Sequence, residues 1–345
     1  MISQSLAKNK IIITGIKPSG DLTLGNWLGI IQPLLLLQKK FAEQYEFYFF
    51  IADLHALTTF DKKFDLKQII RNMAAILLSS GLSLSKTTFF LQSDVFAHTY
   101  LSYILECNTY LGELNRMIQF KEKKKKNSSN VRVSLLTYPI LMASDILLYD
   151  ADIVVVGKDQ KQHLELTRDL AIRFNSFYGD IFKIPEFLKI GYTINSLTHP
   201  DKKMSKSFFL DKEKDKGCIF LLEDLNNIRT KIMQAVTDDI GEIKYNPEKQ
   251  PGISNLLKIY AGLNGIEISQ AESLFVNYSY KEFKIKLASL ILEKIKIIQD
   301  NFKNLINNEI LEKTFANGAS KANEISRQKI NKIRKILGIK YFFKL

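Results

Sequence analysis

The chain has 345 residues and a net charge of +13, and its 46% hydrophobic and 25% charged residues are typical of a soluble globular protein large enough for two cores. Its apolar runs are far shorter than a membrane span, and its first residues lack the apolar core of a signal peptide, so we expect a cytoplasmic protein without a membrane partner. The two cysteines, Cys107 and Cys218, lack a CxxC spacing, which predicts reduced structural thiols and no zinc site.

The first part of the chain alternates between predicted strands and predicted helices. An apolar strand at 11–14 precedes a helix at 25–44, where the interior Pro33 predicts a kink or a break because it removes one hydrogen bond. Further strands are expected at 46–53, 87–92 and 151–157, and further helices at 61–80 (with Gly81 as its stop), 97–110, 139–149 and 160–174. This alternation predicts a Rossmann-like parallel sheet that helices cover on both faces.

Beyond about residue 210 the spacing of apolar residues becomes helical. We expect helices at 221–237, 252–263, 269–277, 281–302 and 309–337, with at most a brief extended piece at 217–221. The prediction is therefore an α/β domain at residues 1–210 and an all-helical domain at 211–345, whose last helix could pack back on the first domain. Residues 281–345 hold fifteen Lys and Arg against six Asp and Glu, which favours an RNA or DNA partner, although an AT-rich genome also inflates lysine counts.

Two short stretches carry the chemistry. The first, IIITGIKPSGDLTLGNWLG at 11–29, reads as a strand, a tight turn and the start of a helix near Gly25. Free backbone N–H groups and the helix dipole make such a helix start attractive to phosphate, although neither GxGxxG nor GxxxxGK[ST] is present. The second, KKMSKS at 202–207, places two lysines three residues apart with a serine between them, a pattern that can wrap a triphosphate.

Together these stretches resemble the two signatures of the class I aminoacyl-tRNA synthetases. PSG at 18–20 with TLGN at 23–26 is similar to the first signature, and KMSKS at 203–207 matches the second letter for letter. The tryptophan and tyrosine enzymes share the PSG form. The segments at 112–123, 135–175, 235–239 and 251–260 look like those of bacterial tryptophanyl-tRNA synthetases, so we favour this family over the tyrosine enzymes.

The resemblance implies a two-step reaction. The carboxylate of L-tryptophan attacks the α-phosphate of ATP, and the resulting tryptophanyl-adenylate acylates the 3′-terminal ribose of tRNA(Trp). Positioning and charge stabilisation would supply the catalysis without a side-chain nucleophile. Mg²⁺ is implied as a cofactor bound through the ATP phosphates, since the sequence offers no acidic cluster for a metal site made by the protein alone. An inactive RNA-binding paralogue is an alternative against which the intact second signature argues.

The resemblance also assigns the nucleotide site. Thr23 and Asn26 would contact the phosphates, and Lys203 and Lys206 would hold the developing charge on diphosphate. Thr23 is equally placed to cap a helix, a role compatible with the first. The residues expected to bind ATP are Lys17, Pro18, Ser19, Gly25, Asn26, Gly157, Lys158, Asp159, Ile194, Lys203, Met204, Ser205, Lys206 and Ser207.

The tryptophan site is centred on Asp145. This carboxylate interrupts an apolar helix, and the resemblance implies that it accepts the indole N–H; without the resemblance, a surface Asp would be the preferred interpretation. Met142 lies one turn earlier on the same face and would pack on the indole ring. The remaining candidates for this pocket are Tyr138, Gln160, Gln119 and His55, of which His55 could equally be a core histidine at a strand end.

Three further features bear on partners and on differences from the family. KEKKKKNSSN at 121–130 predicts a mobile surface loop, which is either a solvated charge run or a contact to the tRNA backbone. Lys17 stands where bacterial relatives commonly have Gln, and Phe208 and Phe209 stand where Asp-Pro often follows the second signature. A homodimer is implied by the family, and no insertion of editing-domain size is present.

Overall fold

The computed structural model describes residues 10–41, 43–58, 65–126, 131–157, 160–188, 190–204 and 215–339. Five parallel strands form one sheet in the order β3-β2-β1-β4-β5. Their bounds are β1 Lys10–Ile16, β2 Tyr45–Ile51, β3 Thr87–Leu91, β4 Ile153–Val155 and β5 Glu186–Leu188. The prediction of a Rossmann-like parallel sheet is confirmed, and β5 is a strand that the sequence did not reveal because it is only three residues long and partly exposed.

Both faces of the sheet are buried, which explains the continuous apolar runs of its strands. Along β1, Ile12 faces one core, while Ile11 and Ile13 face another. The helices around the sheet are α1 Leu24–Asn26, the π-helix Trp27–Ile31, α2 Gln32–Phe41, α3 Asp53–Ala56, α4 Leu66–Ser79, the 3-10 helix Gln92–Asp94, α5 Ala97–Glu106, α6 Leu111–Asn115, α7 Ile118–Lys126, α8 Val133–Leu147 and α9 Lys161–Tyr178.

The helix predicted at 25–44 shows how the chain accommodates Pro33. It continues through the proline, but the turn immediately before it has π-helical hydrogen bonds, in which the Gln32 N–H donates to the Trp27 oxygen. A proline in a helix interior lacks an N–H and crowds the preceding turn, and a widened turn is a known way to relieve this conflict. The expected disruption is therefore a change of hydrogen-bond pattern within a continuing helix.

Two other predictions need adjustment. Residues 121–126 of the predicted lysine-rich loop are the end of α7, so the loop interpretation is wrong for this part, and residues 127–130 lie outside the described ranges. Lysine has a good helix propensity, which the charge pattern obscured. The helix predicted at 61–80 begins at Leu66, capped by the Asp65 side chain, and Gly81 with φ of 98° ends it as expected.

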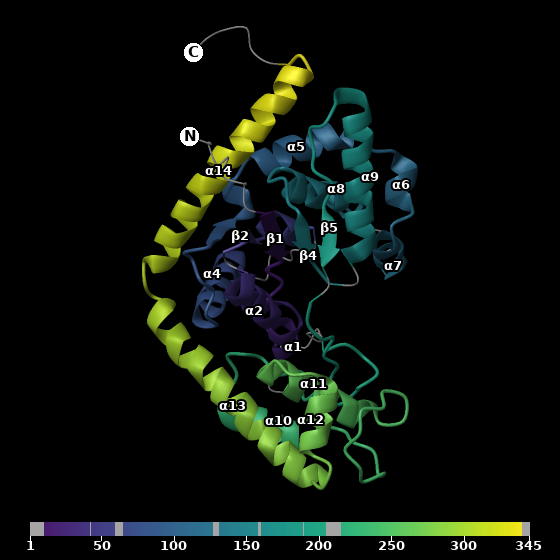
Figure 1. Cartoon of the computed structure of the whole chain (residues 1–345), viewed down its shortest axis with the longest axis vertical. Coiled ribbons are helices and arrows are strands. Elements are labelled where there is room, and N and C mark those ends of the chain that lie inside the picture. The colour runs from purple at the N-terminus through teal and green to yellow at the C-terminus, as the bar shows by residue number, and fades with distance from the viewer. Residues whose placement is uncertain are drawn as a thin grey trace, which may run out of the picture.

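The part of the chain after residue 215 is helical, as predicted. Its helices are α10 Leu225–Met233, α11 Pro251–Asn264, α12 Ile268–Leu274, α13 Tyr280–Leu305 and α14 Ile310–Ile336. The long helices α13 and α14 run along one side of the whole molecule (Figure 1). No helix among the described residues has both the length and the apolar character that a membrane span requires.

Helix α14 lies against β3, at the edge of the sheet. Its Gly318 approaches the strand so closely that an added Cβ would lie 1.8 Å from the Phe89 carbonyl oxygen. The core that contains Ile12 of β1 also contains Ile291 of α13. Because the helical part shares a core with the sheet, the boundary at residue 210 stays a prediction.

Candidate active site

The candidate active site lies at the carboxyl ends of β1 and β4, neighbouring strands at which the sheet changes its winding direction. The Thr14 hydroxyl of β1 donates to the Val155 oxygen of β4 over 2.7 Å and fixes the two strand ends together. A cavity of about 830 Å³ opens here. It is lined by fourteen of the residues predicted for the nucleotide and amino-acid sites: Lys17, Ser19, Gly25, Asn26, His55, Gln119, Tyr138, Met142, Asp145, Gly157, Gln160, Ile194, Lys203 and Met204.

The other predicted residues fall into two groups. Thr23 and Pro18 are buried and do not line the cavity. Outside the described residues are Lys158, Asp159, Ser205, Lys206 and Ser207, so the structure says nothing of their placement. The same holds for Phe208 and Phe209.

The first signature is held by a capping box. The Thr23 hydroxyl accepts from the Asn26 N–H over 3.1 Å, and the Asn26 side-chain oxygen accepts from the Thr23 N–H over 3.1 Å. Each side chain therefore accepts a hydrogen bond from a main-chain N–H at the start of helix α1, which is the usual role of Thr and Asn at a helix N-terminus. Thr23 is only 1% exposed and serves as the N-cap, whereas Asn26 faces the cavity. The direct contact of Thr23 with phosphate stays a prediction.

The described part of the second signature lies directly against the first. The Met204 N–H donates to the Ile194 oxygen over 2.8 Å, and Asn195 and Lys203 form an isolated bridge, which fixes this turn. A Cβ added to Gly25 would lie 3.3 Å from the Cβ of Met204. The two signatures, far apart in sequence, thus form adjacent walls of one cavity, with Asn26 and Lys203 available to phosphate oxygens.

Lys17 lies in this wall as well. Its ammonium group donates to the Thr58 hydroxyl over 3.3 Å, and the side chain is partly buried. The cavity is therefore lined by two lysines, Lys17 and Lys203, among the described residues.

The same cavity is also lined by a buried carboxylate. Asp145, on α8, accepts hydrogen bonds from Gln92 over 2.7 Å, from His98 over 2.6 Å and from His55 over 2.9 Å. Burial alone would raise the pKa of Asp145, but the hydrogen bonds from the two histidines lower it to about 2. The group is therefore ionised, and an ionised carboxylate acts only as a hydrogen-bond acceptor.

Three residues of this cluster were missed by sequence reasoning: Gln92, His98 and Tyr149. His98 is fully buried, and its second ring nitrogen lies 2.8 Å from the Tyr149 hydroxyl. Gln92 directly follows β3, and a polar residue at the carboxyl end of a parallel strand was a signal that could have found it. His98 and Tyr149 lie within apolar stretches, and no local pattern marks them.

A second polar cluster lies beside the first. The Tyr138 hydroxyl contacts the Gln119 side chain over 3.1 Å and His163 over 3.0 Å, and the other ring nitrogen of His163 lies 2.8 Å from Gln160. These contacts bring together three predicted residues from α7, α8 and the start of α9. His163 was not predicted, and it is 1% exposed.

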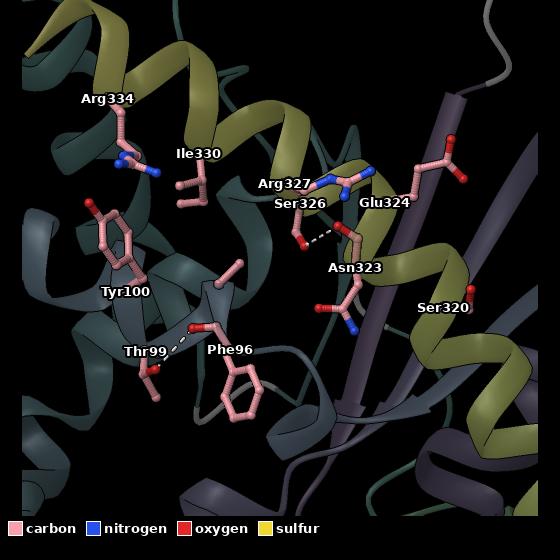
Figure 2. A pocket seen from close by; sticks show the side chains of 11 residues that line it. Phe96, Thr99, Tyr100, Ser320, Asn323, Glu324, Ser326, Arg327, Ile330 and Arg334 are labelled. Atoms are coloured by element: carbon pink, nitrogen blue, oxygen red, sulfur yellow. Dashed lines mark hydrogen bonds between the residues drawn. The ribbon is translucent and has the colours of Figure 1, made fainter. Parts of the chain in front are cut away.

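A separate hollow of about 870 Å³ lies between α5 and α14 (Figure 2). Tyr100 points toward Ile330 and Arg334 of the C-terminal helix, and Phe96 and Arg327 also line the hollow. It contains none of the predicted site residues. We assign the candidate active site to the first cavity, because only that one combines both signatures with the ends of β1 and β4.

Comparisons with known proteins identify the family of this chain. The sequence profile of the family described as tRNA synthetases class I (W and Y) matches residues 6–295. The tryptophan–tRNA ligase of Halalkalibacterium halodurans is 46% identical over 332 residues, which are 96% of this chain and 98% of that protein.

Two solved structures are similar along their whole length. Tryptophanyl-tRNA synthetase from Mycoplasma pneumoniae has a TM-score of 0.86 at 36% identity and covers 96% of this chain and 98% of its own. The enzyme from Campylobacter jejuni, complexed with ADP and tryptophan, has a TM-score of 0.77 at 33% identity and covers 95% of this chain and 99% of its own.

Proposed function

The chain belongs to the class I tRNA synthetases of the tryptophan and tyrosine (W and Y) type, and on that basis we propose that it attaches L-tryptophan to tRNA(Trp) with the use of ATP. The observation that carries the choice of substrates is the composition of one cavity. Asn26 and Lys203, which we assign to a nucleotide end, line the same cavity as the ionised Asp145 carboxylate, which we assign to an amino-acid end. The relatives of which the chain covers nearly the full length are tryptophan–tRNA ligases.

The amino-acid end of the cavity suits an aromatic ring with one N–H. Met142 provides apolar surface one turn from Asp145, and the ring of Tyr138 stands edge-on to His55 at 6.2 Å between centroids. We propose that the indole N–H donates to Asp145. A buried acceptor of this kind discriminates strongly against a substrate that lacks the donor, because the carboxylate would lose a partner.

The nucleotide end would work by holding charge. Asn26 at the helix start and Lys203 in the second signature would bind the phosphates, together with Lys206, and Lys17 adds a further cation. Attack by the tryptophan carboxylate on the α-phosphate places developing charge on the departing diphosphate. Fixed ammonium groups and N–H donors stabilise this charge without reorganisation. The adenylate then transfers its aminoacyl group to the 3′-terminal ribose of the tRNA.

We propose that Mg²⁺ enters this site together with the nucleotide. Among the described residues, no three His, Cys, Asp or Glu side chains come together as metal ligands. The carboxylate of Asp145 is already occupied by three donors. Any Mg²⁺ would therefore be held through ATP phosphate oxygens, where it would add to the neutralisation of charge.

The tRNA, the dimer and the compartment are further parts of the proposal. Exposed cations along α13 and α14, among them Lys296, Arg327 and Lys332, support a tRNA contact on these helices. Large exposed apolar side chains on consecutive helices support a homodimer interface: Tyr103, Tyr110, Leu111, Ile118 and Val133. We place the protein in the cytoplasm, where translation takes place.

Exchange of labelled diphosphate into ATP tests the function directly. Tryptophan should stimulate exchange and tyrosine should not. Exchange with tyrosine alone would overturn the substrate assignment. A lack of exchange with every standard amino acid would favour an RNA-binding paralogue. Sedimentation of the purified chain, alone and with tRNA(Trp), tests the dimer and the tRNA contact.

A further inference from the structure

The hydrogen bonds of Asp145 are divided unequally between its two oxygens. Oδ1 accepts from Gln92 and from Nδ1 of His98, over 2.7 and 2.6 Å. Oδ2 accepts from Nε2 of His55 over 2.9 Å. Gln92 and His98 are both fully buried, whereas His55 lines the cavity with 13% of its side chain exposed. The carboxylate thus has one oxygen held by two fully buried donors and one held by a donor that lines the cavity.

The partners of His98 define which of its ring nitrogens donates and which accepts a hydrogen bond. An ionised carboxylate only accepts hydrogen bonds, so Nδ1 of His98 must carry a proton. In neutral His98 the other nitrogen is then an acceptor, and the Tyr149 hydroxyl, 2.8 Å away, is its donor. Burial, together with the charge of Asp145, raises the pKa of Tyr149 well above its usual value, so this hydroxyl keeps its proton.

The ring of His98 has little freedom to move. Its centroid lies 5.9 Å from that of Phe50, 6.0 Å from Phe90 and 5.6 Å from Tyr149. The Ser144 hydroxyl donates to the His98 main-chain oxygen over 2.6 Å and ties α5 to the turn of α8 that carries Asp145. Packing and hydrogen bonds therefore fix the donor and the acceptor relative to each other.

We propose that His98, oriented by Tyr149, is a positioning residue for amino-acid recognition: it holds Asp145 in the one rotation that presents Oδ2 to the indole N–H. This inference rests on the proposed function. The oxygen Oδ2 has a second lone pair beside the one that His55 uses, so the substrate can bind without displacing His98 or Gln92. Loss of His98 would allow the Asp145 carboxylate to rotate and would weaken its recognition of the indole N–H. The binding of ATP would not change.

Three variants separate this role from a structural one. His98→Leu removes both ring nitrogens, His98→Asn keeps a donor near the position of Nδ1, and Tyr149→Phe removes only the hydroxyl that orients the ring. Diphosphate exchange gives KM for ATP, for tryptophan and for β-(3-benzothienyl)alanine, in which sulfur replaces the indole N–H. Thermal melts monitored by circular dichroism show whether each variant is folded.

We expect His98→Leu to raise KM for tryptophan by about ten-fold or more while KM for ATP changes little, because a charge-assisted hydrogen bond is lost. The preference for tryptophan over benzothienylalanine should fall by a similar factor. His98→Asn should restore most of that preference, and Tyr149→Phe should give an intermediate loss. If His98→Leu does not fold, the other two variants carry the test.

The outcomes distinguish the inference from the proposal on which it rests. A wild-type enzyme that uses tryptophan and benzothienylalanine equally well would refute the indole contact at Asp145 itself. A wild type that discriminates, together with folded variants that discriminate just as well, would overturn the role of His98 alone. Equal rises in KM for tryptophan and ATP would also overturn it, since they would indicate a general structural effect.

Discussion

Gly25 and Met204 lie against each other in the wall of the cavity, where a Cβ on the glycine would lie 3.3 Å from the Cβ of the methionine and 3.5 Å from its carbonyl oxygen. This contact joins the two signatures, which are separated by more than half of the chain. The glycine is needed here for close approach, since any side chain would push the second signature away from the helix start.

Gly25→Ala should therefore impair nucleotide binding more than it impairs folding. To make room for the added Cβ, Met204 would have to move by a few tenths of an ångström, and the neighbouring Lys203 would move with it. A displaced charge-stabilising group contributes less to the reaction rate. We expect KM for ATP to rise, or kcat to fall, by about ten-fold. Exchange kinetics at varied ATP measure this effect.

Gly112→Ala is the matched control for that experiment. An added Cβ at Gly112 would meet only the mobile end of the Arg116 side chain, at 3.4 Å. This variant should keep wild-type kinetics. An unchanged KM and kcat in Gly25→Ala would show that the contact between the signatures is unimportant for ATP.

Asp145→Asn should weaken the use of tryptophan far more than the use of ATP. The amide has one acceptor and one donor group, so it cannot satisfy Gln92, His98, His55 and an indole N–H together. We expect KM for tryptophan to rise by about ten- to a hundred-fold. Exchange assays at varied tryptophan and varied ATP test this, and equal rises in both KM values would exclude the indole contact.

Thr23→Val tests the capping role of this residue. Valine keeps the shape of the side chain but leaves the Asn26 N–H without its acceptor. The free energy of unfolding, measured by urea titration, should fall by about 1 kcal/mol. Thr23→Ser keeps the hydroxyl and should restore most of the loss; if serine lowers stability as much as valine, methyl packing rather than the cap is what matters.

Gly318→Ala should separate the C-terminal helix from the edge of the sheet. The new Cβ would clash with the Phe89 main chain, which cannot move without distortion of β3. We expect a loss of about 3 kcal/mol in the free energy of unfolding. Asn317→Ala, one residue earlier and exposed, is the control and should leave the melting temperature unchanged or slightly higher. Equal melting temperatures for the two variants would contradict the packing of α14 on β3.

The stability that Asp145 contributes should depend on pH. Its pKa is lowered from the usual 3.8 to about 2 in the folded protein, so its stabilisation is fully present above pH 3.8 and is lost as the pH falls toward 2. The difference in unfolding free energy between wild type and Asp145→Asn should therefore stay constant from about pH 7 to about pH 5 and shrink by up to about 2 kcal/mol below that. A difference that is independent of pH down to about pH 3 would contradict the lowered pKa.

Much of the fold followed from local patterns. Short apolar runs that alternate with helical periodicity predicted a parallel sheet, and the helical spacing after residue 210 predicted the C-terminal helices. Strand β5 was missed because three residues cannot show a period, and α7 was missed because its lysines resembled a solvated loop. Local sequence predicts secondary structure least well where an element is only a few residues long, or where a run of charged residues hides a good helix propensity.

The sequence by itself predicted the chemistry of a nucleotide site, because contiguous motifs such as 18–26 and 203–207 specify both residue type and spacing. It also singled out Asp145, but only through the resemblance to the tryptophan enzymes, since the pattern of the helix alone favoured a surface Asp. Only the tertiary structure decided which donors surround that carboxylate. Gln92, His98 and Tyr149 come from separate elements of the chain, and three-dimensional packing alone brings them together. The ionisation and the hydrogen bonds of a buried charge depend on the groups around it in space, and these groups do not occur at regular intervals along the sequence.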